Sequence, residues 1–88
     1  MNTYKLTVAT PDGRGFQEEV IGLFLRGAEG DLAILAGHTP FITSVQAGPC
    51  RIHMPDDSEK VATVDGGLLT VSAEAVTLLS GSFQWIEE

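Results

Sequence analysis

The sequence has few of the residues that a disulfide, a nucleic-acid site or a lipid-binding face requires. A single cysteine, Cys50, among 88 residues excludes an intrachain disulfide. Five lysines and arginines stand against twelve aspartates and glutamates, and a net charge of −7 argues against nucleic-acid binding, which needs a basic face. The same charge disfavours direct binding to anionic lipid. It allows a basic protein partner, and charge complementarity would speed that encounter.

Long hydrophobic runs and helical periodicity are also missing. No apolar run approaches the roughly 18 residues of a membrane span, so we expect any contact with a membrane to be made through another subunit. No window of about a dozen residues repeats its apolar side chains with a helical period. These absences leave strands as the expected secondary structure.

Apolar and polar residues alternate along most of the chain, as at Tyr4–Val8 and Cys50–Met54. Turn-forming residues separate these segments, including Gly48-Pro49 and Asp65-Gly66-Gly67. About nine or ten short strands result. We therefore predict one all-β domain over residues 1–88, an antiparallel β-sandwich or flattened barrel.

No group of residues supports catalysis or a cofactor. Cys50 and His53 are three positions apart, so on a strand they point to opposite faces and do not share a metal. Ser44 and His38 lack an oxyanion hole or a nucleophile elbow. The pair Glu18-Glu19 is best explained as a solvated strand edge or a bulge. We expect no catalytic residue, no metal and no cofactor.

The most informative segment runs from Gly27 to Pro40. It reads as turn, strand, turn, with Glu29 and Asp31 at one end of the strand and His38 at the other. A strand of about seven residues is roughly 23 Å long, so a single partner loop does not easily cover both ends. Two interpretations of His38 remain open: a turn residue bonded to the backbone, or a contact residue at a partner surface.

The same segment resembles the hallmark stretch of the epsilon subunits of F-type ATP synthases. It reads Gly27-x-x-Gly30-Asp31-Leu32-Ala33-Ile34-Leu35-x-Gly37-His38-Thr39-Pro40. Similarity continues at residues 4–11, 40–52, 65–71 and 76–79, and so covers almost the whole chain in order. One departure is Thr70, where the family often has glutamate.

This resemblance implies a ten-stranded flattened barrel in the central stalk, bound to the gamma subunit and seated on the membrane-embedded ring of c subunits. The family meets the basic polar loops of this c-ring with residues that correspond here to Asp31 and His38, with Glu29 nearby. For the gamma-facing surface we expect outward apolar residues, with core packing as the alternative for each aromatic. These residues are Phe41, Ile42, Thr43, Phe83 and Trp85.

The implied role is that of a non-catalytic rotor part, which clamps the ring to gamma while ion flow turns the ring. The expected location is peripheral, on the cytoplasmic face of a bacterial plasma membrane, and the coupling ion, proton or sodium, stays open. The family's carboxyl-terminal helical hairpin is not among the 88 residues. We expect a short single-domain form, with a piece of a longer protein as the alternative. The resemblance assigns inhibition of ATP hydrolysis and the response to nucleotide to the helical hairpin, so we expect these 88 residues to have neither property.

A carrier domain resembling biotinyl or lipoyl domains is the alternative function. Such a domain presents a modified lysine at a hairpin tip, and Lys60 follows the tip predicted at Pro55–Ser58. The residues around Lys60 lack a modification motif. The intact mass of the protein separates the two functions, because a carrier gains the mass of its group.

Overall fold

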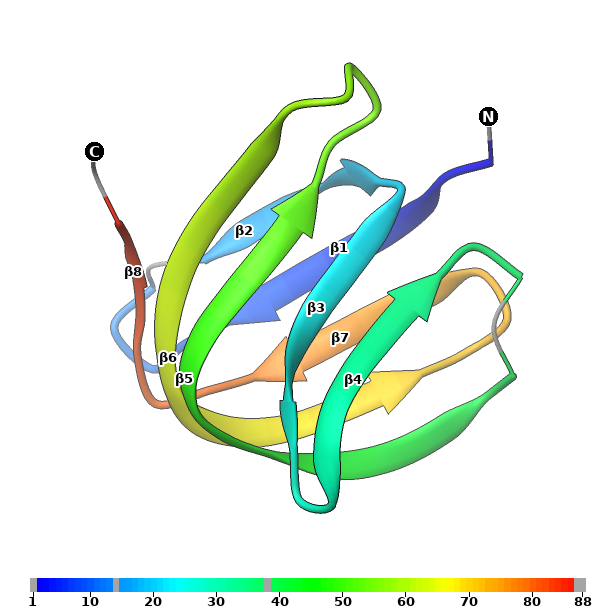
Figure 1. The fold of residues 1–88 in the computed structure, drawn as a ribbon. Coiled ribbons are helices and arrows are strands. Elements are labelled where there is room, and N and C mark those ends of the chain that lie inside the picture. The colour runs from blue at the N-terminus through cyan, green and yellow to red at the C-terminus, as the bar shows by residue number, and fades with distance from the viewer. Residues whose placement is uncertain (1, 14, 38, 87–88) are drawn as a thin grey trace.

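The structure, a computed structural model, describes residues 2–13, 15–37 and 39–86, which form eight strands (Figure 1). Hydrogen-bonded neighbours follow the order β2-β1-β7-β6-β5-β3-β4, and β8 pairs with β6. The strands are β1 (Tyr4–Ala9), β2 (Phe16–Val20), β3 (Gly22–Gly27), β4 (Gly30–Leu35), β5 (Phe41–His53), β6 (Glu59–Val71), β7 (Ala75–Leu79) and β8 (Phe83–Trp85). Those described ranges include no helix that is long and apolar enough to span a membrane.

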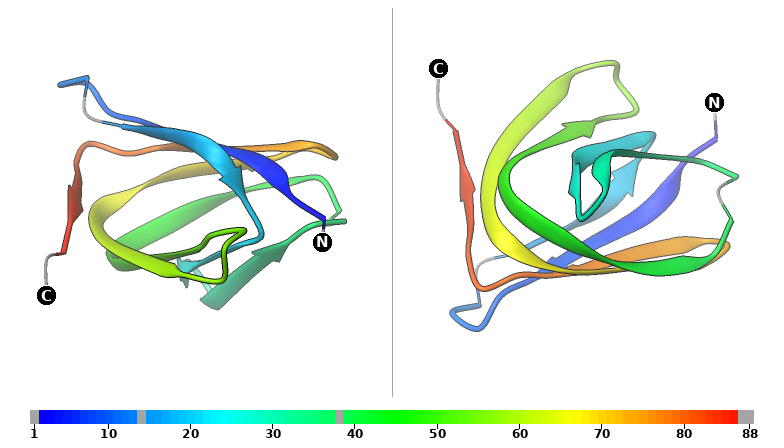
Figure 2. Two further views of the ribbon diagram at one scale, coloured as in Figure 1. Left: turned by 90° about the horizontal axis from the view of Figure 1, so that it is seen from above. Right: turned by 60° about the horizontal axis from the view of Figure 1, so that its bottom comes forward.

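The sheet folds into a sandwich because β5 and β6 are long and curved, which Figure 2 shows in two orientations. The first half of β5 and the second half of β6 pair beside β7, in a layer with β1 and β2. The remaining halves lie beside β3 and β8, in a layer with β4. The core between the layers is apolar, and its fully buried side chains include Leu6, Leu23, Ile52, Leu69 and Leu78. The predicted all-β sandwich is confirmed.

The predicted strand count is too high, since eight strands are found in the described residues. Neither Gly48-Pro49 nor Asp65-Gly66-Gly67 ends a strand, and β5 and β6 run through them. At Gly48 and Gly67 φ is 151°, a conformation that glycine adopts readily. These glycines bend the two strands while the ladder continues on both sides, with Gly48 opposite Val64 and Val45 opposite Gly67.

One strand pair departs from the predicted antiparallel arrangement: β1 and β7 run parallel, with Leu6 opposite Val76. A parallel pair cannot be joined by a tight hairpin and needs a long connection. Here that connection is most of the chain. Alternation within each strand carries no information on such a distant pairing.

Side-chain contacts join strands that are not neighbours in the sheet. The Tyr4 hydroxyl of β1 donates a hydrogen bond of 2.6 Å to the backbone oxygen of Ile34 in β4. Phe16 of β2 packs edge-on against Trp85 of β8, with ring centroids 5.4 Å apart, and Phe83 lies 4.8 Å from Trp85. Phe83 and Trp85 therefore help to close the sandwich.

Glu18 and Glu19 lie on a strand edge, as the sequence predicted. In the part of the chain that the structure describes, β2 pairs only with β1. Glu18 has the same strand parity as the buried Phe16 and Val20, yet it is exposed. A charge in such a position on an edge strand opposes pairing with a strand of another molecule.

High pH will destabilise the domain through two buried groups. Burial raises the pKa of the Cys50 thiol from 9.0 to about 12, and burial next to Cys50 raises the pKa of Tyr4. Both groups stay protonated in the folded protein at a pH where they ionise in the unfolded chain. Their contribution to the free energy of unfolding is therefore fully present below about pH 9 and is lost as the pH rises above it. Cys50 alone removes about 3 kcal/mol at pH 11. Urea unfolding at pH 8 and pH 11 measures the loss, which Cys50→Ala should reduce; equal losses in both proteins would contradict this assignment.

Candidate partner-binding surfaces

The acidic end of the predicted contact segment is the β3–β4 hairpin, at the bottom of Figure 1. Gly27 pairs with Gly30 across the turn at Ala28 and Glu29. A Cβ on Gly27 would lie 2.8 Å from the Leu32 side chain, and Gly30 has φ of +135°. A side chain is therefore disfavoured at both positions, at Gly27 by contact with Leu32 and at Gly30 by the backbone conformation. The turn between them presents an exposed Glu29 at the end of the sandwich.

Asp31 lies opposite Arg26 in the register of the same hairpin. The Arg26 Nε and Asp31 Oδ1 atoms are 3.5 Å apart, and the Asp31 side chain is 85% exposed. Such an exposed pair contributes little stability, so the carboxylate stays available to a partner. Arg26 was not predicted from the sequence. Arg26 directly precedes Gly27, and Asp31 directly follows Gly30. If the two glycines face each other across the turn, Arg26 and Asp31 must also face each other, and this spacing predicts the ion pair.

The far end of β4 lies at Leu35, from which the chain continues to β5 at Phe41. The hairpin turn and this connection lie at opposite ends of β4 in Figure 1. The structure thus places Glu29 and Asp31 at one end of the strand, as expected. His38 lies outside the described residues, and its role stays a prediction.

The five residues predicted to face gamma differ in exposure. Phe83 is 4% exposed, so its side chain belongs to the core. Trp85 is partly exposed but packs against other aromatics, and Thr43 is half-buried. The Phe41 side chain is 36% exposed, and Ile42, at 67%, is the most exposed of the five.

Ile42 belongs to a group of apolar side chains on the outside of the layer that contains β7, called here the outer apolar face. Leu68 of β6 and Leu79 of β7 are exposed directly opposite each other in the ladder. Ile42 lies opposite Thr70, two positions along β6 from Leu68 and therefore on the same face. A shallow hollow of about 410 Å³ adjoins this face, lined by Ala9, Thr10, Pro11, Leu79, Ser80 and Gly81.

Leu68 and Leu79 were not predicted as surface residues, although the sequence carries a signal for them. Each belongs to a leucine doublet, Leu68-Leu69 and Leu78-Leu79. Successive side chains of a strand point to opposite faces, so one leucine of each doublet must face outward. Leu69 and Leu78 are fully buried, which leaves their neighbours on the surface.

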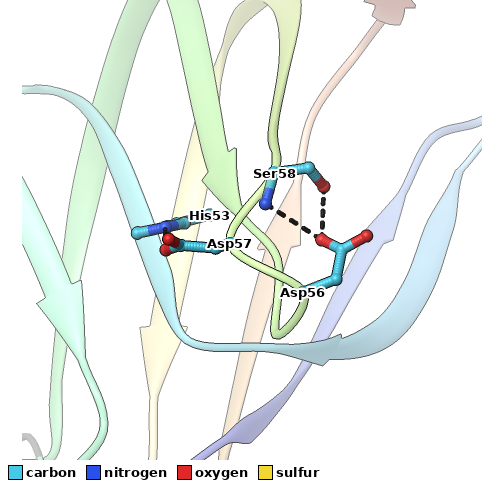
Figure 3. A network of polar contacts seen from close by, with 4 residues as sticks. All are labelled: His53, Asp56, Asp57 and Ser58. Carbon is cyan, nitrogen blue, oxygen red and sulfur yellow. Dashed lines mark hydrogen bonds and ion pairs between the residues drawn. The ribbon is translucent and has the colours of Figure 1, made fainter.

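The tip of the β5–β6 hairpin is polar and held by its own side chains (Figure 3). The carboxylate of Asp56 accepts hydrogen bonds from the Ser58 hydroxyl, at 2.5 Å, and from the Ser58 backbone N–H, at 2.9 Å. These bonds lower the pKa of Asp56. His53 Nε2 lies 3.0 Å from Asp57 Oδ1. The predicted hairpin tip is confirmed, and its polar groups form hydrogen bonds with one another.

Lys60 does not lie on this tip. It is the second residue of β6, and its Nζ is 5.7 Å from the centroid of the Trp85 ring. A carrier lysine must extend from a turn to reach another active site. The position of Lys60 within a paired strand gives the carrier alternative no support.

Cys50 and His53 lie as the strand alternation predicted. Cys50 is fully buried, and His53 is half-buried opposite the exposed Glu59. Within residues 2–13, 15–37 and 39–86, no three His, Cys, Asp or Glu side chains come together as metal ligands. The surfaces described above can bind a partner by charge and by apolar contact.

Known proteins resemble the chain over almost its entire length. Residues 3–86 match the family described as ATP synthase, Delta/Epsilon chain, beta-sandwich domain. The sodium-ion-specific ATP synthase epsilon chain of Acetobacterium woodii is 36% identical over 98% of this chain and 65% of its own. The epsilon chain of Psychrobacter sp. is 40% identical over 91% of this chain and 58% of its own. The chain thus spans less than two thirds of these relatives.

Solved structures share the fold. A chain of the Euglena gracilis mitochondrial ATP synthase superposes with a TM-score of 0.89 at 22% identity, over 98% of this chain and 55% of that one. A chain of the Tetrahymena thermophila mitochondrial ATP synthase central stalk and c-ring gives a TM-score of 0.75 at 16% identity, over 93% of this chain and 66% of that one. The chain belongs to the family of ATP synthase delta/epsilon chains, and residues 3–86 are its β-sandwich domain.

Proposed function

We propose that this chain is a non-catalytic rotor subunit in the central stalk of an ATP synthase, where it couples rotation of the c-ring to ATP synthesis through the gamma subunit. The observation that carries this proposal is the family match over residues 3–86, together with relatives named as ATP synthase epsilon chains at 36% to 40% identity. The two mitochondrial ATP synthase chains support the same fold.

The acidic hairpin end is the proposed c-ring contact. Glu29 and Asp31 are exposed at one end of β4. His38, which follows the other end of β4 in the sequence, is included on the sequence resemblance alone. The ring loops are expected to be basic, and a ring offers several copies of one loop. Charge complementarity of this kind orients the encounter and speeds association more than it adds affinity. Contact with the membrane is then made only through the c-ring, on the cytoplasmic face of a bacterial plasma membrane.

The outer apolar face is the proposed gamma contact. Ile42 keeps the role predicted for it, and Leu68 and Leu79 join it. A few large side chains near the centre of an interface supply most of its binding energy, so we place the energetic centre on these three. Phe41 and Thr43 lie opposite the buried Val71 and Leu69 and so face the core side of β5, and Trp85 belongs to β8 in the other layer, so these three are not part of the proposed surface. The buried Phe83 is left out of it.

Reversing the charge of Asp31 tests the ring contact. We expect Asp31→Lys to weaken binding of the gamma complex of this chain to detergent-solubilised c-ring by about tenfold at low salt, because like charges then face each other. Asp12→Lys, in the β1–β2 turn, is the matched control and should bind as the unaltered chain does. Equal losses in the two variants, or none in either, would remove Asp31 from the contact.

A crosslinking experiment separates the site from the function. A cysteine at Asp31 should crosslink to a cysteine in the polar loop of the c subunit, in complexes first captured through gamma. Capture by gamma without crosslinks keeps the proposed function and rejects the site. Failure to bind gamma at all rejects the function.

A further inference from the structure

One hydrogen bond connects the layer of the proposed gamma contact with the strand of the proposed c-ring contact. Tyr4, the first residue of β1, donates from its hydroxyl to the Ile34 backbone oxygen of β4 over 2.6 Å. β1 lies in the layer that carries the outer apolar face, and β4 lies in the other layer. The bond therefore joins the two layers through strands that are not neighbours in the sheet.

The surroundings of the Tyr4 hydroxyl make it a donor inside the core. Tyr4 is 3% exposed and Ile34 is 2% exposed. Burial, together with the nearby Cys50, raises the pKa of Tyr4, so the hydroxyl keeps its proton at neutral pH. Phenylalanine would fill the same space in an apolar core, and a buried tyrosine hydroxyl usually has a hydrogen-bond partner. The bond to β4 is thus what the hydroxyl adds here.

The two ends of β4 are held differently. At the acidic end, the hairpin turn pairs Gly27 with Gly30 and fixes β4 to β3. At the far end β4 stops at Leu35, and the chain reaches β5 only at Phe41. Among the described residues β4 pairs with β3 alone, and the pairing of β3 with β5 is interrupted between Phe24 and Gly27. The Tyr4 hydroxyl therefore gives the far end of β4 a link to the sandwich other than its pairing with β3.

We propose that Tyr4 is a positioning residue for the c-ring contact, because its bond to Ile34 holds the far end of β4 against the layer that binds gamma. This inference rests on the proposed function, since it takes Glu29, Asp31 and His38 as the residues that meet the c-ring. A strand held at both ends presents the residues on either side of it in one arrangement, so little order has to be gained on binding. The same bond passes a load from the c-ring side to the layer that binds gamma.

A conservative variant tests the proposal, because Tyr4→Phe removes the hydroxyl and keeps the aromatic ring. We expect this variant, in complex with gamma, to bind detergent-solubilised c-ring about fivefold more weakly, the usual effect of losing one buried hydrogen bond. Its affinity for gamma alone should stay within about twofold of the unaltered chain, because the outer apolar face is unchanged.

The matched control is Val8→Ala. Val8 is buried in the same strand, and its truncation weakens packing in the core without removing a hydrogen bond between the layers. Its affinities for gamma and for the c-ring should both stay within about twofold of the unaltered chain.

Hydrogen exchange reports directly on the far end of β4. In Tyr4→Phe we expect the amides of Ile34 and Leu35 to exchange about fivefold faster than in the unaltered chain, while β7 amides such as that of Val76 keep their rates. A role in general packing would instead speed exchange in β4 and β7 alike.

The outcomes separate this inference from the proposed function. The inference is overturned if Tyr4→Phe binds the c-ring as tightly as the unaltered chain, if Val8→Ala loses as much c-ring binding, or if Tyr4→Phe loses gamma binding to the same extent. Faster exchange spread evenly over β4 and β7 overturns it as well. Failure of the unaltered chain to bind gamma is a different result, which rejects the proposed function and this inference with it.

Discussion

Replacing Gly67 by alanine will remove much of the stability of the domain, whereas the same change at Gly48 will remove far less. Both glycines have φ of +151°, so alanine is strained at either position by about 1–3 kcal/mol. They differ in their surroundings. A Cβ on Gly67 would lie 2.0 Å from the backbone oxygen of Leu79, while a Cβ on Gly48 would meet nothing within 4 Å.

The contact at Gly67 involves backbone, so no side-chain rotation relieves it. Gly67 lies beside Leu68, which pairs with Leu79, and an added methyl group must push β6 and β7 apart. We expect a loss of more than about 4 kcal/mol for Gly67→Ala, against about 1–3 kcal/mol for Gly48→Ala. Urea unfolding of the two variants measures the difference. Equal losses would show that conformation alone, and not the contact, makes glycine necessary at Gly67.

Replacing Leu68 by aspartate will strongly weaken the proposed binding to the gamma subunit without unfolding the domain. Leu68 is 43% exposed, so a carboxylate there stays solvated in the free protein. In the proposed interface it would be buried without a partner, opposite Leu79. We expect binding to weaken by at least about 30-fold, the loss of a central apolar contact worth roughly 2 kcal/mol or more.

The matched control for this experiment is Leu35→Asp. Leu35 is also an exposed leucine, at 53%, but it ends β4 in the other layer. Its replacement should leave gamma binding within about twofold of the unaltered chain, because rim or remote positions contribute little. Titration calorimetry with purified gamma subunit measures both variants. If Leu35→Asp lost binding and Leu68→Asp kept it, the gamma surface would lie on the opposite layer.

Sequence alternation was sufficient to predict the sandwich but not its connections. Inside each strand the burial of one face follows from the side-chain pattern, as at Tyr4, Leu6 and Val8. The residues at Gly48-Pro49 and at Gly66-Gly67 fit a turn that ends a strand, and they fit equally well a bend within one continuous strand. What keeps the strands continuous there is the pairing of β5 with β6 on either side, which is set by residues far away in the chain.

The candidate sites show the same division. The turn at Ala28 and Glu29 follows from the spacing of Gly27 and Gly30, so the exposed acidic end could be predicted locally. The residues predicted to face gamma could not be assigned to the core or to the surface. Neighbouring apolar residues of a strand point to opposite faces, and the sequence alone does not say which face is inside. Thus Phe83 is in the core, whereas Ile42 is on the surface.

Reconstitution of ATP synthesis tests the rotor role most directly. Membrane vesicles from the source organism, stripped of their own epsilon chain, would receive the purified chain and an ion gradient, and ATP formation would be followed. We predict that the unaltered chain restores gradient-driven synthesis, while Leu68→Asp, folded but unable to bind gamma, does not. Binding of the unaltered chain without any return of synthesis, or equal restoration by both proteins, would contradict the account.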